Sequence, residues 1–316
     1  MGSLKGSPGG VDAEESGASA VETFDESLQH VVGVGLGDDG AGVDAWGEEI
    51  FGGGLMSYLR LLWTFVRIGA MNELAYRANF WVQLLQSLFS MGVALAGLAV
   101  IFSHTEELGG WQPAELVALL GVFFLMSGLI GALVQPSMQR FMEDVRQGTL
   151  DFTLTKPEDS QVLVSVSEVR VWKFLDVVQG AVLIGWALAE IGLQTGFMHA
   201  ASFAITLVAG AAIVYSFWLV LATFSFWFIK AENILVIFQA VYSAGKYPVA
   251  IYPRWLKMAL TFLVPVAFAV TVPSEALVGR LSTEVFWGAL VMAVVMVVGA
   301  RVFWLWGVRH YSGASA

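Results

Sequence analysis

Long apolar runs separated by short polar connections occupy the chain after residue 55. A bilayer has a hydrocarbon core of about 30 Å, which a helix of about 20 apolar residues crosses. Six runs meet that length: 80–102, 113–135, 174–192, 199–228, 258–278 and 285–306. A seventh stretch, 231–245, is shortened by Lys230 and Glu232, so we interpret it as an interfacial helix or a continuation of the fourth run. The pattern predicts an all-α polytopic membrane protein with six transmembrane helices.

The segment before the first run has a different pattern. Over residues 56–79, Arg60, Thr64 and Arg67 share one narrow stripe of a helix, and apolar residues occupy the rest. A helix with that distribution lies in the membrane interface. We therefore expect an N-terminal interfacial helix ahead of the spans.

Charge is concentrated in residues 1–55. The chain is 57% hydrophobic and 13% charged, with a formal net charge of −10. The first 55 residues hold 11 Asp or Glu and one Lys, which gives −10, and 14 of the 34 glycines. An acidic, glycine-rich segment of this kind is expected to be disordered. Met56 opens the membrane-like sequence, so 56–316 is expected to form the transmembrane domain and Met56 is an alternative native start.

Lysine and arginine in the connections predict the orientation, because positive charge is retained on the cytoplasmic side. Arg140, Arg146, Lys156, Arg170 and Lys173 follow the second run. The connection after the fourth run holds Lys230, Lys246, Arg254 and Lys257. Of the remaining connections, only the one with Arg280 carries a basic residue. Both termini are therefore expected in the cytoplasm.

Residues for catalysis are sparse. The sequence has no cysteine and four scattered histidines without ligand spacing, so we expect no metal site. The one Gly-Lys pair, Gly245-Lys246, lacks the Walker A context, so this chain is not expected to bind or hydrolyse ATP. Asp176, Glu190, Glu275 and Glu284 lie near the ends of predicted spans, which favours interfacial carboxylates facing water. Ion-coupled transport, which uses charged groups at mid-membrane, is therefore disfavoured.

The connection between the second and third runs is the most informative part of the sequence. Residues 138–147 fit a short amphipathic helix, and Gly148 suits the left-handed cap that ends it. Pro157 breaks the chain. Asp159 or Ser160 can then cap a helix leading into the third span. A rigid helix end outside the membrane is a surface that a soluble partner can bind, and the alternative is an ordinary loop.

Several motifs in this order resemble the ABC-2 type permeases, the membrane subunits of ATP-binding-cassette exporters, in their six-span branch. The matching residues are Arg146-Gln147-Gly148-Thr149-Leu150-Asp151, Leu154-Thr155-Lys156-Pro157, Ser160-Gln161, Tyr76-Arg77-Ala78-Asn79-Phe80, Tyr247-Pro248, Ile251-Tyr252-Pro253, Pro265, Pro273 and Tyr311-Ser312. The resemblance runs from about Met56 to the C-terminus.

The resemblance implies an elbow helix, six spans, a coupling helix between spans two and three, and two permeases, identical or sister chains, on two ATPase subunits. ATP and Mg²⁺ would be bound by the ATPase and no cofactor by this chain. The residues expected to couple to the ATPase are Glu143, Asp144, Arg146, Gly148, Leu150, Asp151, Lys156 and Pro157.

The sequence thus favours a permease in a bacterial plasma membrane, in contact with lipid and not with nucleic acid. Its expected cargo is an amphipathic or lipid-like molecule that is exported. A stand-alone carrier or channel is the first alternative, and an intramembrane enzyme is the second.

Overall fold

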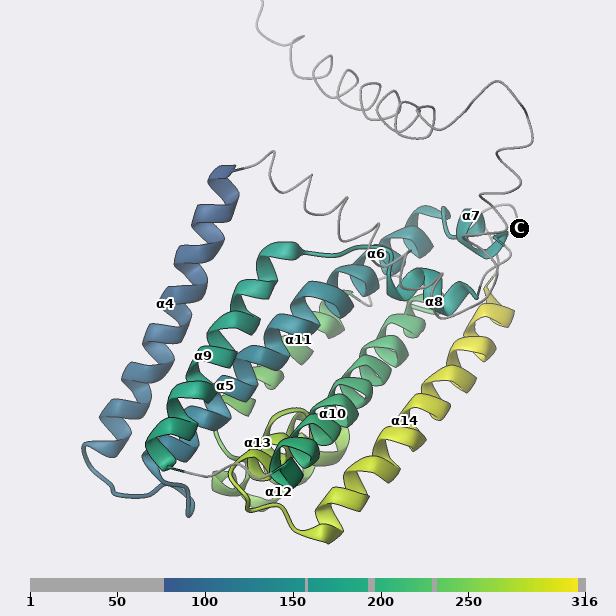
Figure 1. Cartoon of the computed structure of the whole chain (residues 1–316). Coiled ribbons are helices and arrows are strands. Elements are labelled where there is room, and N and C mark those ends of the chain that lie inside the picture. The colour runs from purple at the N-terminus through teal and green to yellow at the C-terminus, as the bar shows by residue number, and fades with distance from the viewer. Residues whose placement is uncertain (1–76, 157–158, 193–196, 229–231, 312–316) are drawn as a thin grey trace, which may run out of the picture. The chain divides into compact units, whose positions relative to one another are not determined.

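The computed structural model describes residues 77–156, 159–192, 197–228, 232–311, and these are almost entirely helical (Figure 1). The acidic segment 1–55 and most of the predicted elbow helix, up to residue 76, lie outside the described residues.

Long helices alternate with short helical pieces along these ranges. They are α4 (Arg77–Phe102), α5 (Pro113–Leu129), η1 (Ile130–Val134), α6 (Gln135–Gln147), α7 (Asp151–Leu154), α8 (Ser160–Ser165), η2 (Val171–Lys173), α9 (Phe174–Ile191), α10 (Phe197–Thr223), η3 (Phe224–Phe226), α11 (Glu232–Tyr242), η4 (Ser243–Lys246), η5 (Val249–Ile251), α12 (Arg254–Met258), η6 (Ala259–Leu263), η7 (Ala267–Thr271), α13 (Val272–Leu277) and α14 (Thr283–His310).

Within the described ranges, five helices are long and apolar enough to cross a membrane: Trp81–Phe102, Pro113–Gln147, Val171–Ile191, Met198–Phe226 and Thr283–His310. They correspond to five of the six predicted runs. The second is a single helix of 35 residues, because α5 continues through the π-helical turn η1 into α6. The helix expected over 138–147 is therefore the end of span two and not a separate element.

Contacts between distant segments define two ends of the helix bundle. At the first, the loop end, Arg280 Nη1 lies 3.0 Å from Glu115 Oε2, and the Arg280 guanidinium lies 5.6 Å from the centre of the Trp111 ring. The ion pair compensates the charge of Arg280. At the other, the α8 end, the ring of Phe141 on α6 lies 5.1 Å from that of Trp304 on α14.

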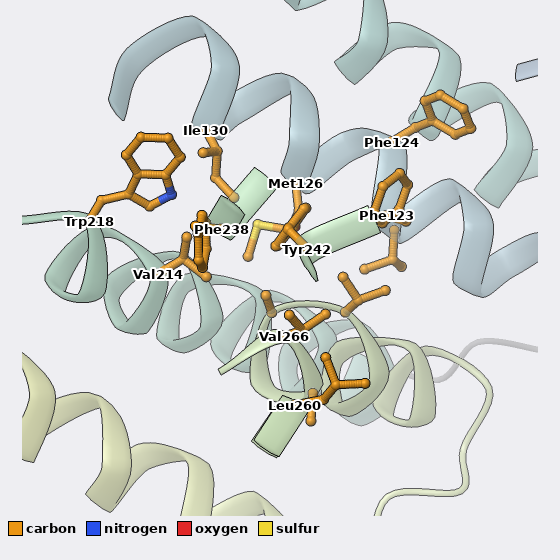
Figure 2. Packing of buried hydrophobic residues seen from close by; sticks show 14 of the residues in the cluster. Phe123, Phe124, Met126, Ile130, Val214, Trp218, Phe238, Tyr242, Leu260 and Val266 are labelled. Atoms are coloured by element: carbon orange, nitrogen blue, oxygen red, sulfur yellow. The ribbon is translucent and has the colours of Figure 1, made fainter. Parts of the chain in front are cut away.

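One face of helix α11 packs against the bundle, which corrects the interfacial interpretation of 231–245. Phe238 is 4% exposed and its ring lies 5.2 Å from Trp218 on α10, while Tyr242 stacks on Phe123 of α5 at 5.5 Å (Figure 2). The chain then reaches the loop end, where the Ile251 side chain lies against the backbone of Gly109. The segment of α11 and η4 therefore runs along the bundle from the α8 end to the loop end.

The prediction of a continuous span over 258–278 is wrong. Val264 has φ −126° and ψ 99°, and the helix breaks there, because helical geometry is disfavoured for the residue before a proline, here Pro265. Both sides of the break return to the loop end: Lys257 and Arg280 both lie within electrostatic reach of Glu275. The backbone of Phe268 meanwhile packs against Gly210, near the middle of α10. Residues 254–278 thus form a hairpin inserted from the loop end, and Lys246, Arg254 and Lys257 do not share an end with Arg140.

Close helix packing holds α5 against α9. A Cβ atom on Gly180 would lie 2.5 Å from the carbonyl oxygen of Gly121, and one on Gly128 would lie 2.7 Å from the backbone nitrogen of Val177. Small residues let helix backbones approach in this way, which suits membranes, where lipid supplies no hydrophobic driving force.

Asp176, at the start of α9, does not face water as the sequence suggested. It is 6% exposed, accepts a short hydrogen bond from Ser87 on α4, and pairs with Lys173 Nζ at 2.9 Å. A carboxylate needs such partners when it is removed from water. The hydrogen bond between Ser87 and Asp176 therefore links α4 and α9.

Candidate functional site

The end of α6 extends beyond the length that a membrane requires. A helix of 35 residues is about 52 Å long at 1.5 Å per residue, against a hydrocarbon core of about 30 Å. No charged residue occurs between Glu115 and Arg140, whereas charged residues are frequent from Arg140 to the end of α6. Arg146 Nη2 donates to Glu143 Oε1 at 2.6 Å, and Arg140 Nε lies 3.5 Å from Asp144 Oδ1. These charged side chains occupy the last two turns of the helix.

Gly148 ends α6 as the sequence predicts, with φ 72° in the left-handed region. The Thr149 N–H donates to the Asp144 carbonyl at 2.9 Å and the Gly148 N–H to the Val145 carbonyl at 3.3 Å, the pattern of a Schellman cap. Leu150 follows and is fully buried. It is therefore an anchor for the corner within this chain and not a surface for a partner.

The short helix α7 follows the corner. Its first residue, Asp151, lies near Tyr311, which follows α14: burial, and then the Asp151 carboxylate, raise the pKa of the Tyr311 hydroxyl. The next residue, Phe152, is 75% exposed, and Lys156 beyond the helix is also exposed. Pro157 lies outside the described residues.

Helix α8 begins at the cap that the sequence predicts. Asp159 Oδ1 accepts from the backbone N–H groups of Gln161 at 3.0 Å and Val162 at 3.4 Å. Helix α8 does not lead directly into span three, because it ends at Ser165 and the chain is irregular before η2.

Asp159 has a second partner on a distant helix. Arg301 of α14 donates from Nη1 to Asp159 Oδ1 at 2.9 Å, and from Nη2 to Asp159 Oδ2 in a short contact. Hydrogen bonding and charge from Arg301 lower the pKa of the Asp159 carboxyl, against the opposing effect of burial. The bidentate geometry is the stronger form of an arginine–carboxylate pair.

A ring of hydrogen bonds extends this contact to α10. Arg301 Nη1 also donates to Gln161 Oε1 at 2.9 Å, and Gln161 Nε2 donates to the Tyr215 hydroxyl at 3.1 Å. The Ser165 hydroxyl lies 2.6 Å from both the Tyr215 hydroxyl and the Gln161 carbonyl. If Ser165 donates to the carbonyl, Tyr215 donates to Ser165, and each of these hydroxyl protons has an acceptor.

The structure thus brings most of the predicted coupling residues onto one corner, formed by the end of α6 and α7. It places Leu150 inside the core instead. Sequence reasoning missed the Asp159–Arg301 contact, although the signal was present: an arginine inside an apolar run requires a partner.

These features define a multi-pass helical membrane protein with a folded polar connection beyond its second span. The chain belongs to the ABC-2 family transporter proteins, whose family profile matches residues 88–315. No curated protein and no solved structure gives a significant match. The family is a membrane component of transport and is not itself catalytic, and its permeases work with ABC ATPase partners.

Proposed function

We propose that this chain is the permease subunit of an ATP-driven exporter and that its connection between spans two and three docks on a separate ATPase. The supporting observation is that the helix of span two is longer than a membrane crossing requires, so that its end, α6, extends beyond the membrane. This end forms a corner that is fixed by Gly148 and anchored by Leu150. An anchored corner transmits displacement, whereas a loose loop absorbs it. The coupling residues are Glu143, Asp144, Arg146, Gly148, Asp151, Lys156 and Pro157, with Leu150 acting from inside.

The chain would cross the membrane six times if α11 and η4 form the sixth crossing, in place of the predicted span over 258–278. Together they hold 15 residues, about 22 Å of helix, which suits a crossing completed by the residues next to it. The α8 end would face the cytoplasm, because it has more basic residues than the loop end. Seven gather at the α8 end (Arg140, Arg146, Lys156, Arg170, Lys173, Arg301 and Arg309) and four toward the loop end (Lys246, Arg254, Lys257 and Arg280). The loop end, with the hairpin 254–278, would face outward.

In this arrangement each chain supplies half of a transport path, paired with a second copy or a sister permease in a bacterial plasma membrane. The elbow helix over 56–79 would lie in the interface, and the ATPase would bind ATP and Mg²⁺. The apolar surfaces of the spans suit an amphipathic or lipid-like cargo.

Purification of the full chain from its native membranes in a mild detergent tests the proposal. We expect a Walker-motif ATPase to co-purify, and ATP hydrolysis by the complex to fall when Arg146→Ala and Asp151→Ala are combined. Transport by the purified chain alone, without nucleotide, would contradict the proposal and favour a stand-alone carrier or channel.

A further inference from the structure

Arg301 occupies an unusual position in α14. It lies nine residues before the end of the helix at His310, about 13 Å along its axis. Its neighbours Val298 and Val302 are 57% and 62% exposed and have the apolar character of a lipid-facing surface. A charged side chain at such a position is costly unless it is paired. Its partner, Asp159, comes from a segment that does not span the membrane.

Because of this pairing, the position of α8 depends on the position of α14. Asp159 caps α8 through two backbone N–H groups while it binds both terminal nitrogens of Arg301. If α8 moved away alone, Arg301 would be left unpaired beside apolar surface. Tyr215 also ties α8 to α10, through Gln161 and Ser165. Displacement of α8 without α10 and α14 is therefore unfavourable.

We propose that the Asp159–Arg301 pair transmits movement of the connection between spans two and three to α14. This inference rests on the proposed function, because it takes the ATPase as the source of the movement. Arg301 and Asp159 are positioning residues: neither needs to touch the ATPase or the cargo. The link is separate from the docking corner at Gly148, which lies on the other side of α7 in the chain.

The variants for a test follow from the two roles of Asp159. Asp159→Asn removes the charge but keeps a side chain that caps helices well. Arg301→Gln removes the other charge, and the double variant removes both. Tyr215→Phe is a milder variant that deletes one hydroxyl. Arg309→Gln is the matched control, since Arg309 is an exposed arginine on the same helix.

The experiment uses the complex of the full chain with its ATPase in nanodiscs, with introduced cysteines as the only thiols of this chain. A spin label at Gln147 reports docking through its mobility. A pair of labels at Val182 on α9 and Val302 on α14, both exposed, reports movement of α14 through their distance. Each measurement is made with and without ATP.

We expect Asp159→Asn and Arg301→Gln to leave the response at Gln147 intact and to reduce the ATP-dependent distance change at least twofold. The double variant should lose no more than either single variant, because the two residues act through each other. Tyr215→Phe should show a smaller loss, and Arg309→Gln none. An unchanged distance response in Asp159→Asn and Tyr215→Phe would overturn the link while leaving docking in place. No response at Gln147 to the ATPase in the unmodified chain would instead overturn the proposed function, and the link with it.

Discussion

The backbone N–H of Arg170 donates to the carbonyl oxygen of Ala132 at 2.9 Å. That carbonyl has no regular α-helical partner, because the residue four positions later is Pro136, which has no N–H. The π-helical turn η1 covers the same residues. The neighbouring Ser137 hydroxyl donates to the Glu168 carbonyl at 2.9 Å and accepts from the Glu168 N–H at 3.2 Å. A proline in span two thus frees a backbone group that fixes the chain entering span three.

Ser137→Ala should destabilise this junction. Ser137 is fully buried, and its loss leaves both backbone groups of Glu168 without that partner, at a cost of about 1–3 kcal/mol. The melting temperature of the purified chain in detergent measures the effect. Ser202→Ala is the control, because the Ser202 hydroxyl bonds only to the His199 carbonyl of its own helix. Equal melting temperatures for the two variants would contradict the role of Ser137.

Gly180→Ala should separate α9 from α5. The added methyl would meet the Gly121 carbonyl oxygen and the Leu125 backbone nitrogen at 2.5 Å, and overpacking of this kind costs about 1–3 kcal/mol. On the same helix, a Cβ on Gly185 meets nothing within 4 Å, so Gly185→Ala should be neutral or slightly stabilising. Thermal unfolding of both variants tests the difference, and a Gly180→Ala protein as stable as Gly185→Ala would exclude close packing at this site.

Acid should weaken the Asp159–Arg301 pair only at low pH. The pair lowers the pKa of Asp159 in the folded chain below its unfolded value of about 3.9, so its stabilisation is complete above that value and is lost as pH falls through the folded pKa. The difference in melting temperature between the unmodified chain and Asp159→Asn should therefore be constant from about pH 5 to 8 and shrink below about pH 4. A difference that disappears between pH 6 and 8 would show that another group dominates.

Gly148→Val should damage coupling more than folding. Positive φ costs a β-branched residue about 1–2 kcal/mol, so the corner should be re-aimed while the spans keep their packing. Gly192→Val is the matched control, because Gly192 also caps a helix with φ 65° but follows α9 at the loop end. Recovery of ATPase per permease in the membrane should fall for Gly148→Val alone. Equal recovery of ATPase for both variants would contradict the coupling role and indicate that 138–157 is an ordinary loop.

Much of this fold was predictable from the sequence because long apolar runs have few structural solutions in a membrane. Five predicted runs match spans, and the caps at Gly148 and Asp159 follow from residue types that favour those geometries. The hairpin was not predictable from apolar length, since 258–278 is as apolar as a span. Pro265 was the local signal for its break, and only contacts such as Ile251 with Gly109 show which end of the bundle it enters.

The partners that polar residues find on distant segments were also not predictable from the sequence. Asp176 was expected to face water, but its environment depends on Ser87, which lies 89 residues earlier in the chain. Asp159 and Arg301 are separated by 142 residues. Residue types indicate that such groups need partners, while the choice of partner depends on how the helices pack.

Site-specific crosslinking tests the central claim, that the connection after span two docks on a separate ATPase, most directly. A photo-reactive side chain is placed at the exposed residue Gln147 in one variant and at the exposed loop-end residue Glu106 in another, in the full chain in its native membranes. The account predicts a crosslink to a Walker-motif ATPase from Gln147 and none from Glu106. A crosslink from Glu106 with none from Gln147, or none from either position while transport continues, would contradict it.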